Sequence, residues 1–166
     1  RLDGVTGVQT CALPIFLLKA SIGYPDHAST LRILDGAGVR AHDVTIPPVV
    51  TADAVLEMAQ LARTVHVDPS VNDYVSRLVD ATRAATEVRL GVSVRGALAL
   101  VRSAKTLAAA SGRHYVVPDD VKSLAEPVLA HRLVLDPEAE FDGVTPSSII
   151  GQLLLETAPP SDRQAV

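Results

Sequence analysis

The segment from Ser93 to Gly112 constrains the fold more than any other part of this 166-residue chain. Ser93 is a favoured residue for the start of a helix, and Gly112 is a favoured residue just after a helix end. Between them, the unbroken run Ala97–Val101 places apolar side chains on every side of a helix. Such a helix must be covered by other elements, so this segment predicts a central buried helix.

Five further segments carry helix signals. Asp26 and Thr51 can cap helices that reach about Leu34 and Thr64, and Asp68 with Pro69 opens another helix toward Thr86. Pro118 and Thr145 begin the last two helices. Aromatic residues make up only 3% of the chain and Trp is absent, which favours an aliphatic core of packed helices.

Extended structure is expected at only two places. Residues 16–22 alternate weakly and predict a short strand, and residues 115–117 predict a brief extended link. The fold class predicted is therefore all-α, a bundle of about four to six helices with one or two minor strands.

The charge of the chain is unevenly distributed. The overall charge is −4, but residues 88–118 contain no acid and five bases, so the rest of the chain carries 10 bases against 19 acids, or −9. This basic island is either an anion site or a solvated helix face with counter-charges elsewhere. The five bases are Arg89, Arg95, Arg102, Lys105 and Arg113.

The sequence lacks the motifs of a complete active site. It contains no phosphate-binding Gly-x-x-x-x-Gly-Lys-Ser/Thr loop and no Gly-x-Ser-x-Gly nucleophile turn. Its single Cys, Cys11, argues against a disulfide and for a reducing compartment. The five histidines show no metal-ligand spacing, and Asp119 and Asp120 are interpreted as helix-start residues. These histidines are His27, His42, His66, His114 and His131.

Arg95 is the remaining candidate. It lies at the start of the predicted buried helix, where a cation opposes the positive end of the helix dipole and free backbone amides point outward. A bound anion, such as a phosphate clamped by the guanidinium, would reconcile both features. The alternative is an exposed arginine that pairs with a distant carboxylate.

Several spaced motifs together resemble one protein family. Gly91-Val-Ser-Val-Arg95 with the helix after it, Gly112-Arg-His-Tyr-Val-Val-Pro-Asp-Asp-Val121 and His131-Arg-Leu-Val-Leu135 resemble the carboxy-terminal lid of MoxR-type AAA+ ATPases. Thr64-Val-His-Val-Asp68 also matches that lid, and Phe16-Leu-Leu-Lys-Ala-Ser-Ile-Gly-Tyr-Pro-Asp26 resembles the segment that leaves the ATPase core. The resemblance covers residues 16–160 in the right order.

The resemblance implies a role for Arg95 and for the protein as a whole. Arg95 would be the sensor-2 arginine, which reaches from the lid to the phosphates of ATP held in the core. The complete protein would be a cytoplasmic, chaperone-like ATP hydrolase that forms a homo-oligomeric ring and remodels client proteins. ATP would be its nucleotide, and Mg²⁺ would be bound by the core. Independently of the resemblance, no apolar run approaches eighteen residues, so we expect no membrane span, and the net negative charge argues against non-specific nucleic-acid binding.

The chain departs from the family pattern at three places. Val94 replaces a usual Pro, and Val117 replaces a frequent Thr whose hydroxyl would cap the next helix. Pro14-Ile15 stand where the family has an Asp-Arg pair. Residues 1–15 also resemble the translation of a sequencing adapter, so we interpret them as a non-native segment.

These interpretations give four regions: residues 1–15 as the non-native segment, 16–50 as the core-to-lid junction, 51–158 as the helical lid, and 159–166 as a disordered tail. The principal functional hypothesis is a lid fragment that hydrolyses no ATP alone. One alternative is a free-standing helical module that binds other proteins. Another is a nucleic-acid binder that uses the basic island, which the negative overall charge opposes.

Overall fold

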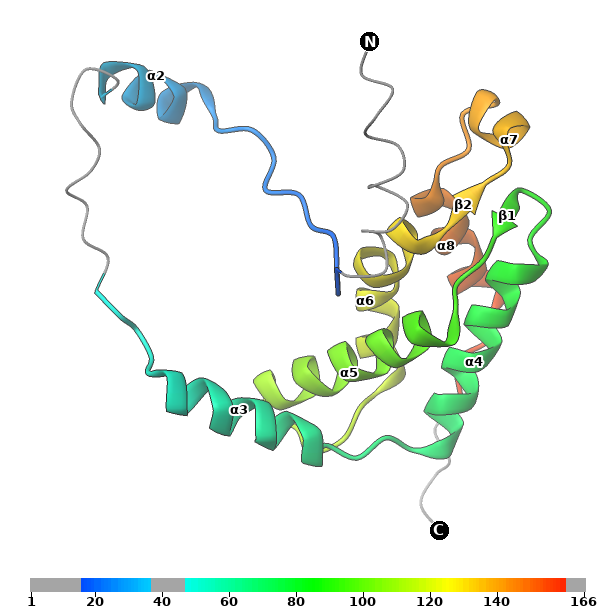
Figure 1. Ribbon diagram of the computed structural model, residues 1–166, viewed down its shortest axis with the longest axis horizontal. Helices are drawn as coiled ribbons and strands as arrows, with labels where there is room; N and C mark the ends of the chain where they lie inside the picture. The colour runs from blue at the N-terminus through cyan, green and yellow to red at the C-terminus, as the bar shows by residue number, and fades with distance from the viewer. Residues whose placement is uncertain (1–15, 37–46, 161–166) are drawn as a thin grey trace.

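The computed structural model describes residues 16–36 and 47–160, and it confirms the predicted all-α fold (Figure 1). Two short strands accompany the helices. In chain order the elements are α2 (His27–Gly36), α3 (Ala52–Thr64), α4 (Pro69–Ala84), β1 (Val88–Leu90), α5 (Val94–Ala110), α6 (Pro118–Leu129), the 3-10 turn η2 (Ala130–Arg132), β2 (Val134–Leu135), α7 (Pro137–Phe141) and α8 (Pro146–Glu156).

Helix starts follow the capping residues predicted from the sequence. The Thr51 hydroxyl accepts a hydrogen bond from the Ala54 amide at 3.2 Å, and an Asp68 carboxylate oxygen accepts one from the Ser70 amide at 2.8 Å. The Thr145 hydroxyl accepts from the Ser148 amide at 3.1 Å. Ser93 differs, because it occupies the N-cap position of α5 but its side chain makes no capping hydrogen bond. Within the described part of the chain, no side chain therefore caps the start of α5.

The core lies where α4, α5, α6 and α8 meet. Helix α5 packs against α3, α4 and α6, and α8 closes the bundle against α4 and α6. The largest side chains with no exposed surface are Tyr74, Leu78, Leu100, Leu129 and Ile150. These residues come from α4, α5, α6 and α8, so one aliphatic core with a single buried tyrosine joins the four helices.

The expectation that α5 is buried on every side is wrong. Its inner face is buried, including Ala99, Leu100 and Ala104, but Leu98 remains 51% exposed and Val94 67% exposed. Three neighbouring helices cover only part of the surface of α5, and the described residues leave one flank open. The helix is therefore central in the bundle without being enclosed by it.

The strand predicted over residues 16–22 is also wrong. These residues run without a regular strand partner, although the Lys19 amide donates to the Pro127 carbonyl at 2.8 Å. A strand needs a neighbouring strand to pair its backbone groups, and among the described residues none lies beside this segment. The two strands that form are β1 and β2, which pair antiparallel with Val88 opposite Leu135. The predicted link at residues 115–117 contributes a single bridge, between His66 and Tyr115.

Helix α2 stands apart from the bundle (Figure 1), although the Asp26 carboxylate caps it by accepting from the Ser29 amide at 2.7 Å. Of the junction, residues 16–36 and 47–50 are described, while the segments interpreted as non-native (1–15) and as the end of the tail (161–166) lie outside the described residues. Within the part that is described, no helix is long and apolar enough to cross a bilayer.

Candidate functional site

The tight turn from β1 into α5 is held in place by α4. Val92 is fully buried, its amide donates to the Thr82 hydroxyl at 3.0 Å, and its carbonyl accepts from Arg83 Nε at 2.8 Å. Gly91 lies so close to α4 that an added Cβ would come within 2.8 Å of the Thr82 carbonyl oxygen. The sequence Gly-Val-Ser thus fixes where α5 begins, and with it the position of the next arginine.

Arg95 is the second residue of α5 and its side chain is exposed. The first turn of this helix contains no acid. None of the four ion pairs within the described ranges involves Arg95. An unpaired guanidinium therefore stands beside the positive end of a helix dipole, which is an arrangement that favours a bound anion.

A second arginine, Arg132, lies beside this helix start. A Cβ added to Gly96 would be 3.2 Å from Cδ of Arg132, so the stem of that side chain passes over the residue next to Arg95. The pKa of Arg132 is lowered, mainly by burial and secondly by the positive charge of Arg95. The sequence places Arg132 in a motif but indicates no role for it, because two of its three backbone partners are distant in the sequence.

The rest of the basic island does not gather at this site. Lys105 Nζ donates to the Arg63 carbonyl at 2.6 Å, tying α5 to α3, and Arg113 is paired with Asp120. Arg89 and Arg102 are exposed. The structure therefore divides the five cations into two that make structural contacts, two on the surface, and Arg95 at the helix start.

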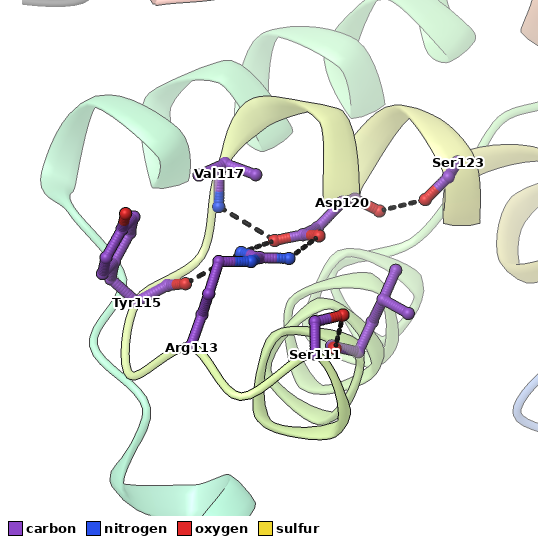
Figure 2. A network of polar contacts seen from close by, with 7 residues as sticks. Ser111, Arg113, Tyr115, Val117, Asp120 and Ser123 are labelled. Atoms are coloured by element: carbon purple, nitrogen blue, oxygen red, sulfur yellow. Dashed lines mark hydrogen bonds and ion pairs between the residues drawn. The ribbon is translucent and has the colours of Figure 1, made fainter.

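Figure 2 shows the polar network around Arg113, at the other end of α5. The Arg113 guanidinium donates to both carboxylate oxygens of Asp120, at 2.8 and 2.6 Å, and the Val117 amide donates to the same carboxylate at 2.9 Å. Burial alone would raise the pKa of Asp120, but these hydrogen bonds outweigh it and hold that pKa below its ordinary value. This network fixes the loop between α5 and α6, and sequence reasoning assigned Asp120 only to the helix start.

No metal centre is formed by the part of the chain that the structure describes. No group of three or more His, Cys, Asp or Glu side chains is placed to hold an ion there. Cys11 and His42 lie outside the described residues. Arg95 can contact an anion, but these residues supply no carboxylate cluster for Mg²⁺.

Comparisons with known proteins show which family this chain is similar to. The sequence pattern of the AAA lid domain matches residues 80–153, which run from the end of α4 through most of α8. The chaperone MoxR1 of Mycobacterium tuberculosis is 32% identical over 171 aligned residues, covering 95% of this chain and 44% of MoxR1. Over nearly its whole length, this chain is similar to the lid region of MoxR-type AAA+ ATPases.

Two further comparisons extend the similarity over nearly the whole chain. The uncharacterized protein YeaC of Bacillus subtilis is 33% identical over 165 residues, covering 99% of this chain and 51% of YeaC. A crystal structure of a candidate ATPase from Cytophaga hutchinsonii superimposes with a TM-score of 0.79 at 28% identity, covering 91% of this chain and 48% of that one. The chain therefore spans about half the length of these three proteins.

Proposed function

We propose that this lid belongs to an ATPase in which Arg95 contacts the phosphates of ATP from the start of α5, as a sensor-2 arginine does. The observation that carries the proposal is the exposed guanidinium at the second position of α5, in a first turn without acids. The described residues hold no phosphate-binding loop and no cluster of acids for a metal. The rest of the ATP site, including the ligands of Mg²⁺, would therefore come from an ATPase core.

The wider assignments of the complete protein follow from the family and are part of the same proposal. MoxR1 is described as a chaperone, which supports a cytoplasmic ATPase that remodels client proteins. AAA+ proteins typically assemble into oligomers, which supports a homo-oligomeric ring in which this lid contacts the ATPase core. On this proposal the chain is a fragment that supplies Arg95 but no hydrolytic centre.

Anion binding by the chain itself tests the role of Arg95. Amide resonances are followed by NMR while inorganic triphosphate is added at matched ionic strength. We expect the resonances of residues 95–97 to shift, because their amides lie in the first turn of α5. Arg95→Ala should abolish these shifts. Arg102→Ala should preserve them, because Arg102 lies seven residues further along the helix, about 10 Å from this end. Equal shifts in all three proteins would refute a phosphate contact by Arg95.

ATP turnover tests the same residue in a chimera with a longer relative, provided that the chimera with Arg95 hydrolyses ATP. A chimera would carry residues 16–160 in place of the matching region of B. subtilis YeaC. Replacing Arg95 with Ala should lower turnover about ten- to a thousandfold if the guanidinium stabilises charge on the transferring phosphate. Arg95→Lys should restore part of the turnover, because an ammonium cannot form a two-pronged contact. Unchanged turnover in Arg95→Ala would return this residue to the class of ordinary surface arginines.

A free-standing module that binds proteins is the second candidate. The observation that favours it is the apolar surface of α3, where Val55, Leu56, Met58 and Leu61 are each at least 50% exposed. Light scattering separates the two hypotheses, because a module adapted to exist alone should stay monodisperse while an uncovered lid should self-associate. Nucleic-acid binding is disfavoured, because two of the five island cations are engaged by Asp120 and by the Arg63 carbonyl.

A further inference from the structure

The hydrogen-bond partners of Arg132 are backbone carbonyls, whereas a partly buried arginine ordinarily pairs with a carboxylate. Its Nε donates to the Val128 carbonyl at 2.8 Å, within α6. Its Nη2 donates to the Phe16 carbonyl at 2.7 Å and the Leu17 carbonyl at 3.2 Å, both more than a hundred positions away in the sequence. No ion pair of the described ranges involves this side chain. Arg132 therefore links the junction segment to the end of α6 without neutralising its own charge.

Other contacts hold the same segment against the lid. The Lys19 amide donates to the Pro127 carbonyl at 2.8 Å, and Nε2 of His131 lies 3.3 Å from the Phe16 carbonyl oxygen. Pro127 and Val128 belong to the last turn of α6, where carbonyls have no partner within the helix. The junction segment and Arg132 thus satisfy that helix end together, and the Lys19 amide reports whether the segment is attached.

The same arginine also reaches the start of α5. Its Cδ lies against Gly96, directly after Arg95, so two positive side chains are neighbours, and neither forms an ion pair with a described residue. The lowered pKa of Arg132 reflects its burial first and the charge of Arg95 second. Arg132 stays charged throughout, so an anion bound at Arg95 would offset this repulsion and stabilise the Arg132 guanidinium in its hydrogen-bonded position.

We infer that Arg132 is a positioning residue that couples anion binding at Arg95 to the attachment of residues 16–19 on the lid. The inference rests on the proposed function of Arg95. With an anion present, Arg132 holds the Phe16 and Leu17 carbonyls more firmly. The coupling is reciprocal, so firmer attachment of the segment raises the affinity for the anion. The junction that leads into the lid thereby responds to phosphate without touching it.

Hydrogen exchange of the Lys19 amide, measured by NMR on the 166-residue chain, tests this coupling. Inorganic triphosphate at matched ionic strength should slow the exchange about fivefold, the lower end of typical couplings between sites. Arg132→Met keeps an apolar stem beside Gly96 but loses every donor. Its Lys19 amide should exchange about tenfold faster and no longer respond to triphosphate. Arg132→Lys should recover part of the protection, and Arg102→Met should behave as the unaltered chain.

Arg95→Ala gives an independent readout should Arg132→Met fail to fold. This variant retains all hydrogen bonds of Arg132, so Lys19 should stay protected while the response to triphosphate disappears. If triphosphate shifts the resonances of residues 95–97 but leaves Lys19 exchange unchanged, the coupling is wrong and the proposed function stands. If triphosphate changes neither the resonances of residues 95–97 nor the exchange of the Lys19 amide, the coupling and the proposed function are both wrong. A response that persists in Arg95→Ala also overturns the coupling.

Discussion

Replacing Asp120 with Ala should destabilise the lid far more than the same change at its neighbour Asp119. The Asp120 side chain is 6% exposed and receives three hydrogen bonds, two from Arg113 and one from the Val117 amide. Asp119 is 85% exposed and makes one contact, with Lys122 at 3.2 Å. Adjacent residues of identical type, one buried and one exposed, therefore form a matched pair of variants.

The expected loss of stability in Asp120→Ala depends on the polar groups that lose their partner when the carboxylate is removed. Breaking a fully buried ion pair from one side costs about 3–5 kcal/mol. Arg113 retains 27% of its side-chain surface, so water can hydrate the abandoned guanidinium and lower that cost. The Val117 amide also loses its acceptor, which resembles the loss of a helix cap at about 1 kcal/mol. We expect Asp120→Ala to lower the free energy of unfolding by about 2–3 kcal/mol, and Asp119→Ala by less than about 1 kcal/mol.

Urea unfolding followed by circular dichroism measures both variants, and pH supplies a second check. The pKa of Asp120 is lowered in the folded chain, so the unfolded chain binds its proton more readily. The stabilisation is present above the ordinary Asp pKa, near about 4, and is lost as the pH falls toward the lowered value. The difference between the unaltered chain and Asp120→Ala should shrink over that interval. Equal costs for the two variants at neutral pH would refute the stabilising role of this network.

Three further predictions follow from the start of α5 and from the missing motifs. Arg95→Ala should stabilise the chain by about 0.3–1 kcal/mol in urea unfolding, because a cation opposes the helix dipole there; a loss of stability would reveal a structural contact. Gly96→Ala should lower stability by about 1–3 kcal/mol in thermal unfolding, because its Cβ would overlap the Val92 side chain; a neutral result would contradict this close packing. The chain should release no phosphate from ATP above a no-enzyme control, because it lacks a phosphate-binding loop.

Local signals in the sequence were sufficient for the helices. Thr51, Asp68 and Thr145 cap the helices that they were expected to cap, because a cap bonds to an amide only two or three residues away. The short α7 was missed, since Asp136-Pro137 is typical of a turn as well as of a helix start. A five-residue helix also carries too little periodicity for detection.

Contacts between distant residues could not be predicted in the same way. The pairing of β1 with β2 joins Val88 to Leu135, and Arg132 reaches Phe16 across 116 positions. The pair formed by Arg113 and Asp120 is closer in sequence, but a loop between two helices brings its members together. For Arg95 the sequence indicated an exposed cation at a helix start, and this is its location. Its proposed phosphate contact stays a prediction, because the ligand is no part of the chain.

The charged side chains at the two ends of α5 differ in how their charge is balanced. Arg113 is placed as a structural cation should be, with both oxygens of a carboxylate within 2.8 Å. Arg95 and Arg132 are neighbours, and neither forms an ion pair among the described residues, so the positive charge of each raises the electrostatic energy of the other. A neutral residue at position 95 would remove this repulsion and suit the helix dipole better. The hydrogen bonds of Arg132 to backbone carbonyls leave the positive charge of both side chains in place. On the proposed function, an anion from outside the lid would offset this repulsion, and the phosphates of a nucleotide would supply that negative charge.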